Sequence, residues 1–257
     1  MIFNKSVVCP VLIGRENDLQ RLDRLMNQSQ EGSGQIALIS GEAGIGKSRL
    51  VREVKGRASE GTLILEGQCF QTDSALPYSP LLDLFRNYFA THGEEEIVQV
   101  LAASGSQLVH LFPELTTYVP HLTPSAELDA KQEKRRLFQT FVQMITRLAQ
   151  QPLILVIEDL HWSDSTSLEF LLLLARRISS QPILLLLTYR AEETTPELTH
   201  FLAELDRERL GTEFALKRMS PLEVDAMLRT ILNVDSPIST EFLDTIFSFD
   251  RGEPVLH

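Results

Sequence analysis

Eight consecutive residues restrict the possible folds of this chain more than any other segment: Gly41-Glu42-Ala43-Gly44-Ile45-Gly46-Lys47-Ser48. They match the pattern G-x-x-x-x-G-K-[ST] at every fixed position. An apolar run, Ile36 to Ile39, precedes them, and a helical pattern from Leu50 to Ala58 follows. This order of strand, glycine-rich turn and helix predicts a phosphate-binding loop, in which backbone N–H groups and the helix N-terminus face phosphate oxygens. The alternative, a chance glycine turn before a helix, does not account for the full match.

The loop predicts a nucleotide ligand, ATP or ADP, together with Mg²⁺. We expect Lys47 to reach the β- and γ-phosphates and the Ser48 hydroxyl to bind the metal. The residues expected to contact the nucleotide here are Gly41, Ala43, Gly44, Ile45, Gly46, Lys47, Ser48 and Arg49.

Short apolar runs alternate with longer helical patterns along the chain, which is typical of an α/β protein with a largely parallel sheet. The third and fourth runs are nearly unbroken Ile, Leu and Val, as expected for central strands covered on both faces. We therefore predict a P-loop NTPase fold with a five-stranded, mostly parallel sheet between helices. The expected strands are Gln35–Ser40, Thr62–Glu66, Leu153–Ile157, Ile183–Thr188 and Glu213–Leu216.

Helical spacing of apolar residues supplies the remaining elements. Residues 71–130 separate the second strand from the third and contain several short helical patterns and prolines, which indicates a helical insertion. After Met219 the strand pattern stops, so we predict a core over residues 1–218 and a small helical lid over residues 219–257. The other expected helices are Glu16–Gln28, Leu81–Phe89, Glu133–Gln150, Ser167–Ile178, Pro221–Leu232 and Ser239–Phe249.

Two acidic residues, Glu158 and Asp159, end the third predicted strand. Side chains at the carboxyl end of a strand face the crevice where α/β proteins bind ligands. We assign Glu158 to the magnesium site, beside Ser48, and Asp159 to orienting the attacking water. The reverse assignment is the first alternative, and an acidic turn without chemistry is the second.

The fourth predicted strand ends in Thr188-Tyr189-Arg190. In nucleotide-binding sheets, the strand beside the acidic one often carries a polar residue that senses the γ-phosphate, and the Arg190 guanidinium suits this contact. A solvated arginine is the alternative. His161 and Trp162 follow the acidic pair, and their role is left open.

Composition narrows the class of protein. The formal net charge of −11 argues against broad electrostatic capture of nucleic acid by this segment. Cys9 and Cys69 form no CxxC pair, which favours reduced thiols. The beginning lacks a secretory signal, and the apolar runs are shorter than the roughly 20 residues that span a bilayer. We expect a cytoplasmic protein without direct nucleic-acid or membrane binding.

With these residues in place, the chain resembles the STAND class of signal-transduction ATPases, which are relatives of the AAA+ proteins. It is most similar to the ATPase domains of large LuxR-type and maltose-regulator-type bacterial activators. Related domains occur in multidomain adenylate or guanylate cyclases and in some protein kinases. The likeness covers the chain from about Leu12 to Pro254 and rests on four segments: Ile13-Gly14-Arg15-Glu16, the phosphate loop, Glu158-Asp159-Leu160-His161-Trp162-Ser163-Asp164, and Gly252-Glu253-Pro254.

The resemblance implies that Gly14 and Arg15 lie over the adenine and that Pro254 contacts the base. Glu158 stands where aspartate is usual in these relatives, and Glu253 stands where asparagine is common. Relatives continue into a winged-helix segment, a helical-repeat sensor and often an effector. We therefore expect this chain to be an excised module or a fragment.

By the same resemblance, the domain is expected to be a slow ATPase that acts as a switch. ADP holds a resting monomer, ATP permits self-association, and hydrolysis resets the switch. The expected output is transcription, with cyclase or kinase signalling as alternatives. Two rival functions are a DNA-handling AAA+ ATPase and a nucleotide-binding scaffold without turnover.

Overall fold

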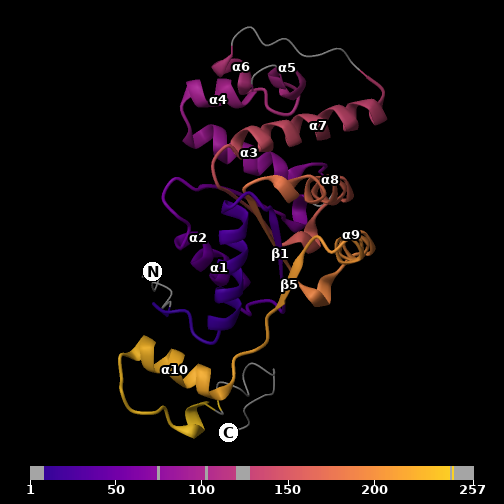
Figure 1. Cartoon of the computed structure of the whole chain (residues 1–257). Coiled ribbons are helices and arrows are strands. Elements are labelled where there is room, and N and C mark those ends of the chain that lie inside the picture. The colour runs from indigo at the N-terminus through magenta and orange to yellow at the C-terminus, as the bar shows by residue number, and fades with distance from the viewer. Residues whose placement is uncertain (1–8, 74–75, 102–103, 120–127, 244, 246–257) are drawn as a thin grey trace, which may run out of the picture. The chain divides into compact units, whose positions relative to one another are not determined.

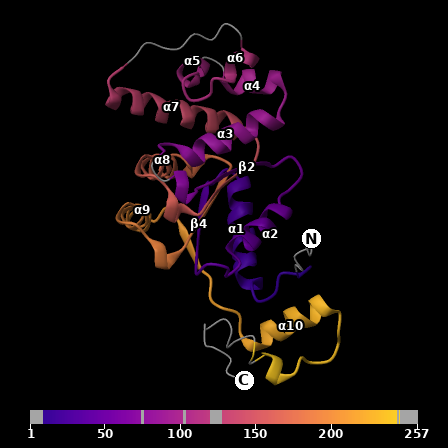
Figure 2. The same ribbon diagram turned by 180° about the vertical axis from the view of Figure 1, so that it is seen from behind.

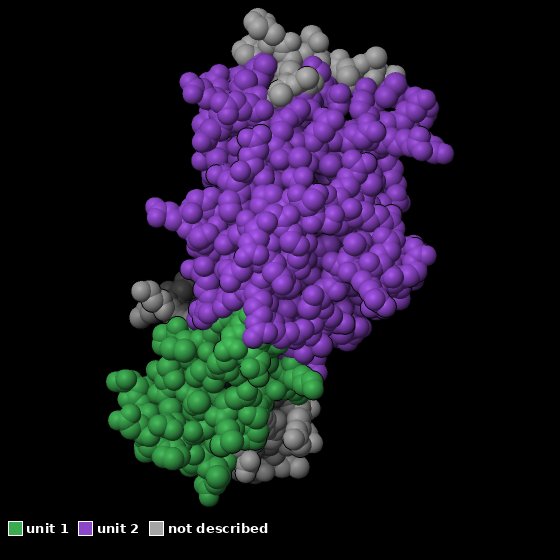
Figure 3. All heavy atoms as spheres, viewed as in Figure 1, with its two compact units in different colours: residues 1–20, 217–257 green, residues 21–216 purple. Residues whose placement is uncertain are grey.

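The computed structural model describes residues 9–73, 76–101, 104–119, 128–243 and 245. The chain divides by packing into two compact units, residues 21–216 and residues 1–20 together with 217–257 (Figure 3). The larger unit contains the sheet and the phosphate loop. The boundary expected between residues 218 and 219 stays a prediction.

Five strands form one sheet in the order β2-β3-β4-β1-β5, and every pair of neighbours is parallel. This confirms the predicted α/β class and the five-stranded sheet. The phosphate loop follows β1, which lies between β4 and β5, whereas the acidic pair lies at the end of β3. The strands are β1 (Gln35–Ser40), β2 (Leu63–Gln68), β3 (Leu153–Glu158), β4 (Ile183–Tyr189) and β5 (Thr212–Ala215).

The sheet is covered on both faces, because alternate residues of a strand point to opposite sides. On β3, Leu155 and Ile157 pack into the large core cluster, while Ile154 and Val156 are equally buried but lie outside that cluster. All seven residues of β4 are buried. Unbroken apolar strands of this kind are stable only between two layers of helices.

Helices supply those two layers (Figures 1 and 2). One layer contains α2 (Lys47–Gly56) and α1 (Glu16–Gln30), of which residues 21–30 belong to the larger unit. Arg57, at the C-terminal end of α2, donates a hydrogen bond at 3.0 Å to Asp23 in the middle of α1, and this bond joins the two helices. The opposite layer contains α3 (Ser79–Thr91), α7 (Ala130–Leu148), α8 (Ser165–Ala175) and α9 (Pro196–Arg207).

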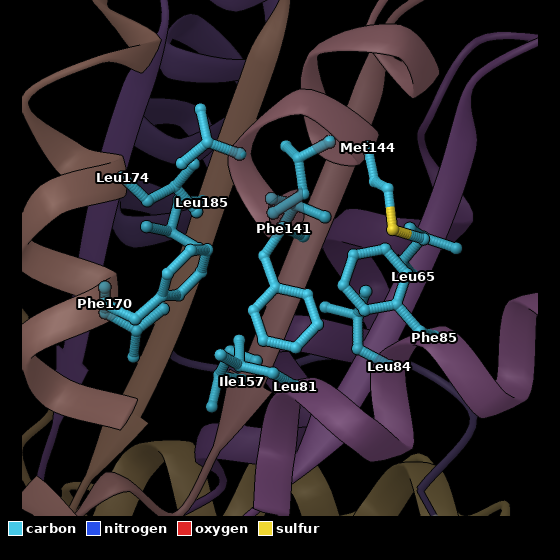
Figure 4. Close-up of a cluster of buried hydrophobic side chains, with 14 of the residues drawn as sticks. Leu65, Leu81, Leu84, Phe85, Phe141, Met144, Ile157, Phe170, Leu174 and Leu185 are labelled. Carbon is cyan, nitrogen blue, oxygen red and sulfur yellow. The ribbon is translucent and has the colours of Figure 1, made fainter. Parts of the chain in front are cut away.

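Aromatic side chains join the second layer of helices (Figure 4). Phe85 of α3 stacks on Phe141 of α7 with ring centroids 5.4 Å apart. Phe141 in turn meets Phe170 of α8 edge-on at 5.7 Å. Such pairs contribute about 0.5–1.5 kcal/mol beyond the area that they bury. These contacts join α3, in the helical insertion, to α7 and α8.

The insertion predicted between the second and third strands is confirmed as helical. After the short turn η1 (Gln71–Asp73) and α3, the chain forms α4 (Glu94–Leu101), α5 (Gly105–Leu108) and α6 (Leu115–Tyr118) before α7 begins. The described residues of the larger unit also include the short turns η3 (Leu160–Trp162), η4 (Ile178–Ser180) and η5 (Ala191–Glu193).

The smaller unit contains α10 (Pro221–Leu232), at the position predicted for the first lid helix. Ser220 and Glu223 form a capping box at its N-terminus, with Pro221 in the first turn. Residues 240–243 and 245 are helical, and the rest of the predicted helix Ser239–Phe249 lies outside the described residues. No helix in the described part of the chain is both long and apolar enough to cross a bilayer.

Candidate functional site

The phosphate loop connects β1 to the N-terminus of α2. Gly44 and Gly46 have φ angles of 75° and 104°, in the left-handed region that glycine adopts without steric cost. The helix begins at Lys47. Gly44, Ile45 and Gly46, the three residues before this N-terminus, therefore form the tight turn that an anion-binding loop requires.

Lys47 is buried, with 7% exposure, and its ammonium closes the loop on itself. Its Nζ donates to the carbonyl oxygens of Gly41 at 2.7 Å and Glu42 at 2.8 Å. Burial lowers the pKa of Lys47, an effect that the nearby Asp159 carboxylate partly opposes. A cation held inside the loop suits the binding of phosphate oxygens at the same place.

Ser48 and Glu158, the two predicted magnesium ligands, are in direct contact. The Ser48 hydroxyl, in the first turn of α2, donates to Oε2 of Glu158 at the end of β3. The sequence places these residues 110 positions apart, and the parallel sheet brings their ends to one edge.

Asp159 is held in an unusual conformation by two neighbouring strands. Its φ and ψ angles are 62° and 44°, in the left-handed region, which aspartate tolerates better than most residues. Its backbone N–H donates to Thr188 Oγ1 at 3.0 Å, and Gln68 Nε2 donates to its carboxylate at 3.2 Å. Thr188 of β4 thus holds the Asp159 backbone, and Gln68 of β2 holds its carboxylate.

Arg190 follows β4 and is paired with an acid. Its guanidinium donates to Glu193 Oε1 at 2.6 Å and lies over the Trp162 ring, with its central carbon 5.0 Å from the ring centroid. The hydrogen bond to Glu193 is the main cause that raises the pKa of Arg190. The charge is therefore permanent and is positioned by one carboxylate and one aromatic face.

A pocket of about 280 Å³ gathers most of the predicted site residues. Its size suits the phosphate part of a nucleotide better than a whole nucleotide, since pockets for drug-sized ligands begin at about 300 Å³. Its lining consists of Ala43, Gly44, Gly46, Lys47, Ser48, Arg49, Asp159 and Arg190.

Three predicted contacts lie outside the described residues of the larger unit. Gly14 and Arg15 belong to the smaller unit, where Arg15 donates to the Lys217 carbonyl at 2.5 Å. Gly14 has a φ angle of 72°, in the left-handed region that favours glycine, and a Cβ atom there would lie 2.5 Å from Glu223 Oε1. Pro254 lies outside the described residues.

Four residues at the site were not singled out from the sequence. Gln68 and Thr188 hold Asp159, as described above. Glu192 Oε1 accepts a hydrogen bond from the backbone N–H of Ala43 at 3.1 Å, and Glu193 accepts from Arg190. A polar residue at the end of a predicted strand, or just after it, is the sequence signal that could have identified them. Parallel strands end at the same edge of the sheet, so such residues are expected to lie near one another.

His161 is fully buried beside this pocket. Its side chain is 0% exposed, and among the described residues neither ring nitrogen has a hydrogen-bond partner. Nε2 lies 3.7 Å from Glu193 Oε2, and the ring packs against Trp162 with centroids 4.5 Å apart. Burial lowers the pKa of His161, which keeps the imidazole neutral at pH 7.

The donor set at this edge fits magnesium. Ser48 and Glu158 offer two oxygen ligands, and magnesium is commonly bound by one or two side chains together with phosphates and water. No cluster of three or more His, Cys, Asp or Glu side chains occurs in the described ranges, so these residues do not form an all-protein metal cage.

Comparison with known proteins identifies the family. The family model described as "AAA ATPase domain" matches residues 11–187, which is more than half of the chain. An uncharacterized protein from Rhizobium meliloti (strain 1021) is 30% identical over 192 residues, which cover 70% of this chain and 18% of that protein. The chain thus spans less than a fifth of the length of this relative.

Solved structures with a similar fold share little sequence with the chain. Cdc6p from Pyrobaculum aerophilum is 14% identical with a TM-score of 0.48, over 93% of this chain and 54% of that one. A STAND protein with a tetratricopeptide repeat sensor from Pyrococcus horikoshii is 16% identical with a TM-score of 0.44, over 95% of this chain and 29% of that one. Family membership rests on the family model and not on these likenesses.

Proposed function

The chain belongs to the AAA ATPase domain family, and we propose that it is the nucleotide-operated switch of a multidomain bacterial signalling protein in the cytoplasm. The observation that carries the proposal is the direct contact between Ser48 of the phosphate loop and Glu158 of β3, at the edge of the pocket that Lys47, Asp159 and Arg190 line. A binding loop alone requires no acid opposite to it, whereas hydrolysis does.

Each residue has a distinct task in this proposal. The loop N–H groups hold the phosphates, and Lys47 neutralises charge on the β- and γ-phosphates. Ser48 and Glu158 hold magnesium, which supplies charge neutralisation when it is bound. Asp159 orients the attacking water and accepts its proton, and Arg190 contacts the terminal phosphate.

The reaction then serves regulation. A ligand shifts an equilibrium between two conformations only by its difference in affinity for them. The terminal phosphate and its metal provide this difference between ATP and ADP through Lys47, Ser48, Glu158 and Arg190. The resemblance to STAND regulators supports self-association in the ATP state. We propose transcription as the output, a choice that rests on the frequency of this arrangement among such regulators.

Substitution of Lys47 tests the phosphate site. We expect Lys47→Ala to abolish binding of Mg-ATP, with at least a 100-fold loss of affinity, because the loop loses its one buried cation. Isothermal titration calorimetry on the whole chain measures this loss. Lys55→Ala, which removes an ion pair between α2 and Glu66 of β2, is the control and retains wild-type affinity. Undiminished affinity of Lys47→Ala would show that the nucleotide binds elsewhere.

A further inference from the structure

The short turn η5 places two carboxylates on groups that face the phosphate pocket. Glu192 accepts the backbone N–H of Ala43 at 3.1 Å, and Glu193 accepts the guanidinium of Arg190 at 2.6 Å. Ala43 and Arg190 both line the pocket, so each carboxylate engages a donor that is otherwise available to an anion there.

The Ala43 N–H and the Arg190 guanidinium are expected to meet a different part of the polyphosphate than the other N–H groups of the loop do. The amides that lead into α2 cradle the α- and β-phosphates, and they lie at the helix N-terminus that begins at Lys47. Ala43 lies four residues earlier, and Arg190 follows β4. A terminal phosphate therefore requires the donors that Glu192 and Glu193 engage, whereas a diphosphate does not.

We propose that Glu192, assisted by Glu193, determines the preference of this site for a nucleoside diphosphate over a triphosphate. The inference rests on the proposed nucleotide function and adds a specificity residue to it. A diphosphate binds with both carboxylate contacts intact. A triphosphate must displace them, and it also brings its negative charge close to two carboxylates.

Two properties of η5 support this role: the negative charge of Glu192 and the way in which the turn is held between β4 and α9. A hydrogen bond from its own backbone N–H, and then one from Ala43, hold the pKa of Glu192 below its ordinary value, so the carboxylate is ionised at pH 7. The turn lies between two firmly held ends, the buried strand β4 and the Thr195 cap of α9, whose side chain accepts from the Leu198 N–H at 3.2 Å. A few residues can thus move without disturbing either element. Because both acids are exposed, the expected effect is modest.

Comparison of two nucleotides tests the proposal. Calorimetry measures the affinities of wild type, Glu192→Gln and Glu193→Gln for Mg-ADP and for the magnesium complex of the β,γ-imido analogue of ATP, which is not hydrolysed. For Glu192→Gln we expect affinity for the analogue to rise about three- to tenfold while affinity for ADP stays within about twofold. Glu193→Gln, which frees Arg190, changes the ratio in the same direction. Glu197→Gln, which removes an equal charge from the first turn of α9, leaves it unchanged.

Other outcomes separate the possible failures. A change of equal size for both nucleotides in Glu192→Gln would overturn the proposal, because the residue would then not discriminate. Weaker binding of the analogue alone would overturn it too, since Glu192 would then assist the triphosphate. Retained ADP affinity shows that each variant is folded. If wild type bound neither nucleotide, the proposed function itself would fail.

Discussion

At the scale of single residues, the site depends on one backbone conformation. Asp159 lies in the left-handed region, which costs an L-residue about 1–2 kcal/mol, and its N–H donates to the buried hydroxyl of Thr188. This hydrogen bond offsets part of the strain and holds the backbone, while Gln68 Nε2 donates to the carboxylate at 3.2 Å. Asparagine tolerates the same backbone angles, so its substitution changes the charge and leaves the conformation in place.

We therefore predict that Asp159→Asn binds Mg-ATP within about twofold of wild type but releases phosphate at least about 100-fold more slowly, the usual contribution of a general base. A phosphate-release assay and calorimetry measure the two quantities. Asp206→Asn, on the exposed side of α9, is the matched control. Unchanged turnover would transfer the water-activating role to Glu158 or to another group.

His161 is expected to make the free energy of unfolding depend on pH. Its pKa in the folded state is lowered from the ordinary 6.5 by burial, so below that pH the unfolded chain binds more protons than the folded one. Stability is fully present above about pH 6.5 and falls as pH falls. We predict that His161→Phe, which cannot be protonated, loses less unfolding free energy than wild type between pH 7.5 and 5.5.

Urea unfolding at several pH values measures this slope. His200→Asn, at an exposed position on α9, is expected to keep the wild-type slope. Equal slopes for wild type and His161→Phe would mean that His161 does not contribute to the acid dependence.

At the scale of elements, close approach of α3 to β2 depends on Gly67. A Cβ atom at this position would lie 2.2 Å from the carbonyl oxygen of Pro80, which is backbone and cannot rotate away. We predict that Gly67→Ala lowers the free energy of unfolding by about 1–3 kcal/mol, the typical cost of overpacking.

Gly56→Ala is the matched control, because a Cβ atom there meets nothing within 4 Å. On α2 this substitution is expected to be neutral or stabilising, by up to about 1 kcal/mol. Denaturant unfolding of both variants provides the comparison, and equal stabilities would show that α3 can shift away from β2 at little cost.

Local pattern was enough to predict most elements. The first strand was predicted with its observed bounds, and the other four within two residues, because hydrophobic runs and their periods are local properties. The phosphate loop and the acidic pair could be recognised from the sequence in the same way, and their roles stay predictions. Gln68, Thr188 and Glu192 were missed because their roles depend on strand order and register. The sequence alone does not place the end of β2 beside Glu158, or η5 beside Ala43.

At the scale of the whole molecule, charge separates the proposed switch from a DNA-handling ATPase. The chain has 24 basic and 35 acidic residues. A DNA-binding protein neutralises several DNA phosphates with lysine and arginine side chains, so its affinity for DNA decreases steeply as the salt concentration rises. We predict no measurable affinity for duplex DNA at about 150 mM salt, as tested by fluorescence anisotropy from about 50 to 200 mM. Micromolar affinity with a steep salt slope would favour the DNA-handling function instead.

The position of β4 between β1 and β3 has a consequence for mutational tolerance. It sets the loop-bearing strand and the acid-bearing strand two steps apart, about 9.6 Å, through backbone hydrogen bonds alone. Side-chain changes in the surrounding helices leave that spacing intact. A register slip of one residue would turn every buried side chain of a strand to the opposite face. Mutations in the sheet are therefore expected to give either an intact active edge or an unfolded chain, with few partially displaced sites in between.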